Sequence, residues 1–185
     1  NNGGISGSSW VSFAADLNFS YMGTMAHEFV ELQAGLHGYN LANKMAMQAW
    51  VETYGKRLGY FLPDTLTTRY ALRDFDRYYA GIFEGTRQDS MDPIEYVNLM
   101  LAHYEALKIK EPGKYVNKSI IFSNSLRSVS EIIQINEYRK SEYNRRFLLG
   151  GFITNNVGYK PYNIVMKLVA IRIAGGPWID LVKFP

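Results

Sequence analysis

Hydrophobic and polar positions along the chain alternate between segments with helical spacing and shorter runs typical of strands. Helical spacing is clearest over residues 40–54, and helices are also predicted over 11–17, 25–35, 67–83, 93–107 and 126–136. Strands are predicted over 58–62, 86–88, 119–122, 146–149 and 163–173, the last in a hairpin with 178–182. This order of helices and strands indicates a mostly parallel sheet with crossover helices.

Capping signals mark the starts of two predicted helices. Asp92 is expected to be an N-cap, with Pro93 at the first helical position and Glu95 at the third. Thr24 is predicted to cap an earlier helix, which would place His27 at the third helical position.

Small or polar residues follow the predicted strands, where α/β barrels and open α/β sheets hold their sites. These residues are Asp64, Asp89, Asn124 and Gly150. A complete (β/α)8 barrel needs about 250 residues, and this chain has 185. We therefore expect one α/β domain that is a partial TIM-like barrel, with residues 1–9 as a flexible lead-in. A second chain or an N-terminal portion would complete the barrel, in a homo-oligomer or a hetero-complex.

The composition narrows the class of protein. The chain is 47% hydrophobic and 20% charged, as is typical of a globular domain. Its net charge of +3 would attract phosphates without requiring a nucleic-acid partner. No run approaches the roughly 18 apolar residues of a membrane span, and the first nine residues do not resemble a signal peptide. The absence of cysteine excludes disulfides and fits a cytoplasmic location.

His27 is a candidate nucleophile. A helix N-terminus disfavours the imidazolium ion, and a neutral imidazole can accept a phosphoryl group among free backbone N–H groups. The alternative is a histidine packed under a loop or exposed without a role. Neither it nor His103 has the paired spacing of a metal site, so no residue is assigned as a metal ligand.

Arg87 and Asp89 are two positions apart and would share one face of a strand. The arginine can grip phosphate or stack on a ring, and the carboxylate can accept hydrogen bonds from ribose hydroxyls. The alternative is a structural ion pair.

Two loops after strands are candidate phosphate sites. Residues 123–125 and the pair Gly150 and Gly151 could each present backbone N–H groups to an anion, or form ordinary turns. The basic and aromatic segment 138–146 is the feature that hints at nucleic acid. A solvated helix end is the simpler interpretation, so nucleic acid is not expected as a partner.

Seven motifs stand in the order found in one known family. They are Gly-Ser-Ser-Trp-Val at 7–11, Gly-Thr-Met-Ala-His-Glu at 23–28, Asp-Thr at 64–65, Arg-Asp-Phe at 73–75, Arg-Gln-Asp-Ser-Met-Asp-Pro at 87–93, Phe-Ser-Asn-Ser-Leu at 122–126 and Lys-Pro-Tyr-Asn-Ile-Val-Met-Lys-Leu at 160–168. Over nearly its whole length the chain resembles the C-terminal part of nicotinate phosphoribosyltransferase. In that family the histidine of Gly-Thr-x-Ala-His-Glu is phosphorylated by ATP.

The resemblance implies a reaction for this chain. Nicotinate and phosphoribosyl pyrophosphate would give nicotinate mononucleotide and pyrophosphate, as in NAD salvage. ATP would drive this glycosyl transfer through a phosphohistidine, as in a ligase, with Mg²⁺ on the phosphates. The implied roles are catalysis by His27 and Asp89, substrate binding by Ser9, Asp64 and Arg87, and phosphate binding by Asn124, Ser125, Gly150 and Gly151.

The chain also departs from the family pattern. Met91 replaces a glycine beside the site, where a side chain could obstruct a close approach or a positive φ. Asn124 replaces an aspartate, Trp10 an asparagine, and Leu148 and Gly151 a glycine and a threonine. The family's Phe-Gly-Thr-Arg-Arg segment and N-terminal domain are absent, and whether Asn1 is the natural start stays open. These departures keep a second interpretation, a non-catalytic barrel fragment that serves as a structural or interaction subunit.

Overall fold

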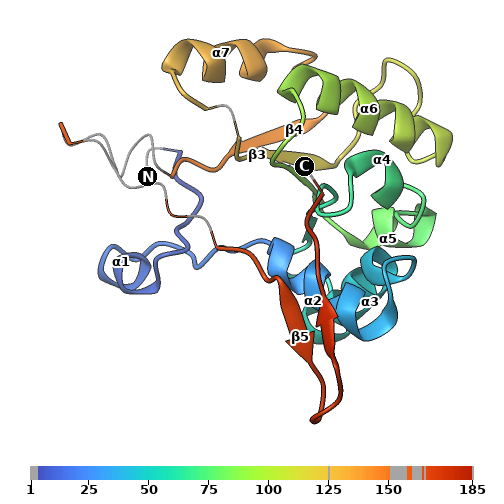
Figure 1. Cartoon of the computed structure of the whole chain (residues 1–185). Coiled ribbons are helices and arrows are strands. Elements are labelled where there is room, and N and C mark those ends of the chain that lie inside the picture. Colours follow the sequence, from blue (N-terminus) through green and yellow to red (C-terminus); the bar gives the residue numbers. More distant parts are fainter. Residues whose placement is uncertain (1–3, 125, 151–157, 160–163, 165, 185) are drawn as a thin grey trace.

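The computed structural model describes residues 4–124, 126–150, 158–159, 164 and 166–184. Along these residues three helices come first, and further helices then separate the first four strands (Figure 1). The elements are α1 (Val11–Asp16), α2 (His27–His37), α3 (Ala42–Tyr54), β1 (Tyr60–Phe61), α4 (Thr68–Ala71), α5 (Arg77–Ile82), β2 (Gly85–Gln88), α6 (Pro93–Ala106), β3 (Ser119–Phe122), α7 (Val129–Glu137), β4 (Asn144–Phe147), β5 (Ala170–Arg172) and β6 (Trp178–Asp180).

The first four strands form one parallel sheet in the order β1-β2-β3-β4. Because neighbouring strands run in the same direction, their carboxyl ends meet at one edge. β5 and β6 form a separate antiparallel hairpin. The predictions of a mostly parallel α/β fold and of a C-terminal hairpin are therefore confirmed. The described strands make an open sheet, and its continuation into a partial barrel stays a prediction.

Buried strands and amphipathic helices build the core. All four residues of β3 are buried, as expected for a parallel strand covered on both faces. In Figure 1, α6 and α7 lie over β3 and β4. Val97 and Leu101 of α6, Ile135 of α7 and Ile120 of β3 belong to one buried cluster. This cluster fixes the strands whose carboxyl ends carry the polar residues.

Local caps explain which helix predictions are confirmed. The Asp92 carboxylate accepts hydrogen bonds from the N–H groups of Ile94 and Glu95, so α6 begins as predicted. The Thr24 cap is wrong, because Ala26 is the N-cap residue of α2 and makes no side-chain cap bond within the described chain. His27 is therefore the first helical residue rather than the third.

The helix predicted over 67–83 is two short helices. α4 ends at Ala71, and the Asp76 carboxylate caps α5 by accepting from two backbone N–H groups. Between them, the buried Phe75 ring stacks on Phe61 of β1, with ring centroids 5.2 Å apart. An N-cap that starts a new helix and a buried aromatic contact therefore outweigh the helical pattern.

Other boundaries also shift. The strand predicted over 58–62 is β1, Tyr60–Phe61, and within the described part of 163–173 the strand is β5, Ala170–Arg172. The helix predicted from residue 126 begins at Val129, where Ser128 and Glu131 form a capping box. β4 occupies Asn144–Phe147 rather than 146–149. The helix after β3 therefore begins later than predicted, and Ser123 and Asn124 do not open it.

The C-terminal segment returns to the sheet. The Leu181 N–H donates to the Val169 carbonyl at 2.8 Å, and the Phe184 N–H donates to the Thr65 carbonyl at 3.0 Å. Figure 1 shows this end of the chain beside the sheet rather than at the tip of the hairpin. The tail is thus attached to the loop that follows β1. No helix of the described residues is long and apolar enough to cross a membrane.

Gly85 sets the spacing of β2 and β3, and its replacement by alanine tests this packing. An added Cβ would lie 1.7 Å from the Ser119 carbonyl oxygen, so the strands would have to separate. We expect Gly85→Ala to lower the free energy of unfolding by about 3 kcal/mol. Gly81→Ala is the matched control, because its Cβ would meet no described atom within 4 Å. In urea denaturation, Gly81→Ala should leave the free energy of unfolding unchanged or raise it by up to about 1 kcal/mol.

Candidate active site

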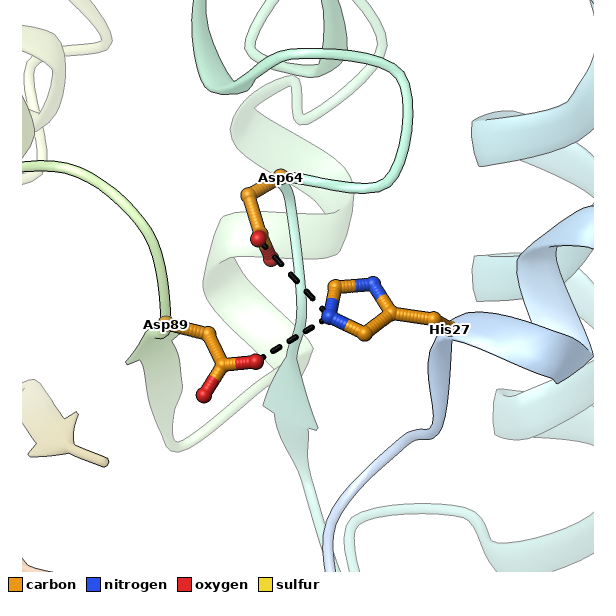
Figure 2. Close-up of side chains that lie close together, drawn as sticks. All are labelled: His27, Asp64 and Asp89. Atoms are coloured by element: carbon orange, nitrogen blue, oxygen red, sulfur yellow. Dashed lines mark hydrogen bonds and ion pairs between the residues drawn. The ribbon is translucent and has the colours of Figure 1, made fainter. Parts of the chain in front are cut away.

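Polar side chains gather at the carboxyl edge of the sheet (Figure 2). Asp64 follows β1, Asp89 directly follows β2, and Ser123 directly follows β3. His27, the first residue of α2, points its ring toward both aspartates. Residues that are far apart in the sequence thus meet here because parallel strands end at the same edge.

His27 is held at both ring nitrogens. Its Nε2 lies 3.0 Å from Asp89 Oδ2 and 3.7 Å from Asp64 Oδ2, and its Nδ1 lies 2.9 Å from Thr65 Oγ1. The residue is only 7% exposed. An ionised carboxylate accepts but does not donate, so Nε2 carries the hydrogen of the bond to Asp89. In the neutral ring, Nδ1 then holds the lone pair and accepts from the Thr65 hydroxyl.

Asp89 connects the histidine to an arginine. Its Oδ1 accepts from Arg87 Nη2 at 2.8 Å and from Ser123 Oγ at 2.5 Å. Burial alone would raise the pKa of the Asp89 carboxyl, but hydrogen bonds from His27, Ser123 and Arg87 outweigh burial and hold it well below its usual range. Asp89 therefore stays a carboxylate and fixes the tautomer of His27.

Arg87 lies on the same face as Asp89, as the strand spacing predicted. Its guanidinium donates to Ser123 Oγ at 2.8 Å, to Thr24 Oγ1 at 3.1 Å and to Asp89. Thr24, predicted as a helix cap, instead accepts this bond from Arg87. These three bonds lie in the guanidinium plane and hold the group in place, so its flat face can stack on a ligand ring.

Asp64 is almost fully buried, at 3% exposure. Its Oδ2 accepts from Ser90 Oγ at 2.8 Å and lies 3.6 Å from Lys183 Nζ. Its Oδ1 is buried and has no hydrogen-bond partner among the described residues. One ligand atom each from His27, Asp64 and Asp89 lies within 4.8 Å of the others. The sequence assigned no metal ligand, but two carboxylates with an unpaired oxygen suit a hard cation such as Mg²⁺.

A pocket of about 230 Å³ adjoins Asp64. Ser90, Met91 and Glu95 line it together with Thr67, which has an unusual positive φ of 69°. Met91 is not among the described residues with a positive φ. Met91, which replaces the family's glycine, is therefore not held at a strained positive φ, and it is one of the residues that line the pocket.

Comparison with known proteins identifies the family to which this chain belongs. The family model for nicotinate phosphoribosyltransferase (NAPRTase) matches residues 1–184. The chain belongs to the nicotinate phosphoribosyltransferase family. The nicotinate phosphoribosyltransferase of Desulforapulum autotrophicum is 36% identical over 168 residues, which are 91% of this chain and 42% of that protein. That of Chromohalobacter salexigens is 35% identical over 179 residues, which are 97% of this chain and 45% of that protein.

Solved structures support the same assignment. Nicotinate phosphoribosyltransferase from Porphyromonas gingivalis matches with a TM-score of 0.88 and 34% identity, over 96% of this chain and 45% of that one. The enzyme from Vibrio cholerae matches with a TM-score of 0.77 and 27% identity, over 97% of this chain and 38% of that one. The resemblance seen in the seven motifs is confirmed. The chain spans less than half the length of each of these relatives.

The structure describes three of the other residues predicted from the family motifs. Asn124 follows β3 and Gly150 follows β4, at the same edge of the sheet. Ser9 is exposed, next to the bridge between Ser8 and Tyr21. Ser125 and Gly151 lie outside the described residues, as does most of the motif at 160–168. Their family roles stay predictions.

The basic segment that hinted at nucleic acid is bonded within the protein. Arg139 pairs with Glu142 at 2.7 Å, and Arg146 pairs with Glu84 at 2.7 Å. Arg145 donates to the backbone carbonyls of residues 136, 140 and 143. These contacts favour the simpler interpretation, in which the segment stabilises β4 and the end of α7.

Sequence reasoning gave no role to Thr65 or Lys183, although both contact the centre. Thr65 was quoted only as part of a motif, although it holds His27 Nδ1. Lys183 carries no local signal, because the return of the C-terminal segment brings it to Asp64. The Asp-Thr motif was the available signal for Thr65, whereas Lys183 could be found only from tertiary structure.

The lowered pKa of Asp89 predicts how stability depends on pH. The folded pKa lies below the unfolded value of about 3.9, so the stabilisation is present above that value and is lost as the pH falls below it. Between about pH 5 and pH 3, the wild type should lose about 1 kcal/mol more unfolding free energy than Asp89→Asn. Urea denaturation at both pH values measures this difference, and parallel losses would contradict the assigned shift.

Proposed function

We propose that this chain is the phosphohistidine-bearing part of a nicotinate phosphoribosyltransferase. The reaction joins nicotinate to phosphoribosyl pyrophosphate and releases nicotinate mononucleotide and pyrophosphate, coupled to ATP hydrolysis. The observation that carries the proposal is His27, held between Thr65 and Asp89 at the carboxyl edge of the sheet. Family membership and the names of the relatives support the same chemistry.

The hydrogen bonds of His27 define its role. With Nε2–H donated to Asp89, the lone pair of Nδ1 attacks the γ-phosphorus of ATP. The N–P bond forms, the bond to the ADP oxygen breaks, and ADP leaves. Positive charge that develops on the ring is stabilised by the Asp89 carboxylate, as in other His–Asp pairs. Thr65 releases Nδ1 for this step and positions the ring before it.

Mg²⁺ fits the carboxylates of Asp64 and Asp89, since Asp64 Oδ1 has no partner among the described residues. When bound, the ion neutralises charge on the phosphates. Ser90 orients Asp64 by donating to its other oxygen.

The substrate contacts follow from the remaining groups. Arg87 stacks its guanidinium on the nicotinate ring, since three in-plane hydrogen bonds within the protein hold the group in place. The Asp89 carboxylate accepts from the ribose hydroxyls. Asn124, Ser125, Gly150 and Gly151 hold phosphate at the loops after β3 and β4, and Ser9 contributes from the N-terminal loop.

The working enzyme needs more than this chain. The relatives are more than twice as long, which supports completion by an N-terminal portion or a second chain, in a partial barrel and in an oligomer. The cysteine-free composition supports a cytoplasmic location.

One observation favours the alternative of a non-catalytic interaction subunit. α1 and its flanks expose apolar side chains to solvent, namely Trp10, Val11, Phe13, Leu17 and Tyr21. Exposed apolar patches mark protein interaction sites. An enzyme part that docks on its completing portion also needs an apolar contact surface, so this surface is compatible with both functions.

Product formation separates the two functions. The protein, with its completing portion, is incubated with nicotinate, phosphoribosyl pyrophosphate and Mg²⁺, with and without ATP. We expect nicotinate mononucleotide by chromatography, and faster formation when ATP is consumed. Absence of product under both conditions would favour the non-catalytic subunit.

A further inference from the structure

The C-terminal segment 181–184 is fixed beside the candidate active site. Leu181 is buried, and its N–H is bonded to the Val169 carbonyl. The Phe184 N–H donates to the Thr65 carbonyl at 3.0 Å, and the hydroxyl of the same threonine bonds His27. Lys183 lies between these two anchors, so its position relative to the imidazole is determined by the backbone.

Lys183 brings a positive charge to Asp64. Its Nζ lies 3.6 Å from Asp64 Oδ2, and the same oxygen lies 3.7 Å from His27 Nε2. The ammonium has three donors, and one of them reaches the Phe184 carbonyl at 3.1 Å. The distance to Asp64 is too long for a hydrogen bond, so this contact is an attraction between charges that uses no donor. The side chain is 20% exposed, so a ligand can reach it.

Arg87 is the other cation beside this cluster, and it is bonded more extensively to the protein. Both cations contact the cluster of His27, Asp64 and Asp89, but the Arg87 guanidinium donates to three protein side chains. All three guanidinium nitrogens of Arg87 are thus engaged by protein side chains, whereas the Lys183 ammonium makes one hydrogen bond among the described residues, to a backbone carbonyl, so it can turn toward an anionic ligand. A phosphate group beside two carboxylates needs such a cation, because the carboxylates repel it.

We propose that Lys183 binds the phosphate or pyrophosphate group of the substrate beside His27. This role rests on the proposed function and adds a binding residue from the C-terminal segment to it. The ammonium acts as a point charge on a flexible stem, which suits a phosphate group that moves during transfer. The positive charge, rather than the exact shape of the side chain, is what the site requires.

Two measurements test the proposal and identify the source of the anion. Both are made on the protein together with its completing portion. Binding of pyrophosphate is measured by calorimetry, and phosphoryl incorporation is measured at ATP concentrations below saturation. We expect Lys183→Met to weaken one or both by at least tenfold, and the affected measurement identifies pyrophosphate or ATP. Lys183→Arg should stay within threefold of the wild type. Lys114→Met is the matched control, since Lys114 is exposed, and it should change neither value.

The outcomes separate failure of the role of Lys183 from failure of the proposed function. If the wild type binds pyrophosphate or is phosphorylated and Lys183→Met matches it in both measurements, the role of Lys183 is wrong while the proposed function stands. If the wild type does neither, the proposed function fails and this role fails with it. If Lys183→Met does not fold, acetylation of wild-type Lys183 replaces the variant. Pyrophosphate should then slow the acetylation of Lys183 but not of Lys114, and equal rates would overturn the proposal.

Discussion

Replacement of His27 by asparagine is expected to abolish phosphoryl incorporation from ATP, with a loss of at least about 1000-fold. Asparagine keeps a polar side chain at the start of α2 but lacks the nitrogen lone pair that attacks phosphorus. Without a phosphohistidine, ATP should no longer accelerate product formation, so the rate of product formation should fall to the rate measured without ATP. Radiolabelled ATP with acid-labile counting of the protein measures the first effect, and chromatography of the product measures the second.

His37→Asn is the control for that experiment. His37 is the last residue of the same helix and is exposed. It should keep wild-type phosphorylation and coupling, because it lies away from Thr65 and Asp89. A His27→Asn variant that retained ATP coupling would show that another group accepts the phosphoryl, and the assigned role of His27 would be wrong.

Asp89→Asn is expected to lower phosphorylation of His27 by about 100-fold to 10,000-fold, as charge removal does in other His–Asp pairs. The neutral amide no longer stabilises positive charge on the ring, and it can donate to Nε2 and so favour the wrong tautomer. Arg87 also loses its charged partner. Single-turnover phosphorylation measured against ATP concentration separates this loss of rate from weaker binding.

Asp76→Asn is the matched control for Asp89→Asn. Asp76 caps α5, and asparagine is an equally good N-cap residue. This variant should keep both the wild-type stability and the wild-type rate. If Asp89→Asn were phosphorylated at the rate of this control, the carboxylate would have no part in the reaction.

Signals that are local in sequence predicted the fold best. The cap at Asp92 and the proline after it depend on neighbours within three residues, so α6 begins where predicted. The hydrophobic run of β3 was predicted with its observed bounds, because all four residues are buried whichever strand lies beside them. The helix predicted over 67–83 was wrong because Phe75 packs on Phe61, a contact that the helical pattern does not contain.

The candidate site likewise contains residues that local signals predicted and contacts that they did not. The polar residues after strands, Asp64 and Asp89, were predicted from the rule that parallel strands end at one edge. The spacing of Arg87 and Asp89 also predicted their shared face. The contact of Thr24 with Arg87 and the approach of Lys183 to Asp64 join residues that are far apart in the sequence. Contacts of this kind depend on tertiary packing and leave no local pattern.

The most direct test of the account is to locate the phosphoryl group after incubation with ATP and Mg²⁺. Peptide mapping by mass spectrometry under alkaline conditions gives the residue, and ³¹P NMR of the labelled protein gives the ring nitrogen. The account predicts one phosphoryl group on His27, attached to Nδ1 because Nε2 is bonded to Asp89. A phosphoryl group on another residue would contradict it. So would the absence of any phosphoryl group on a protein that forms product while it consumes ATP.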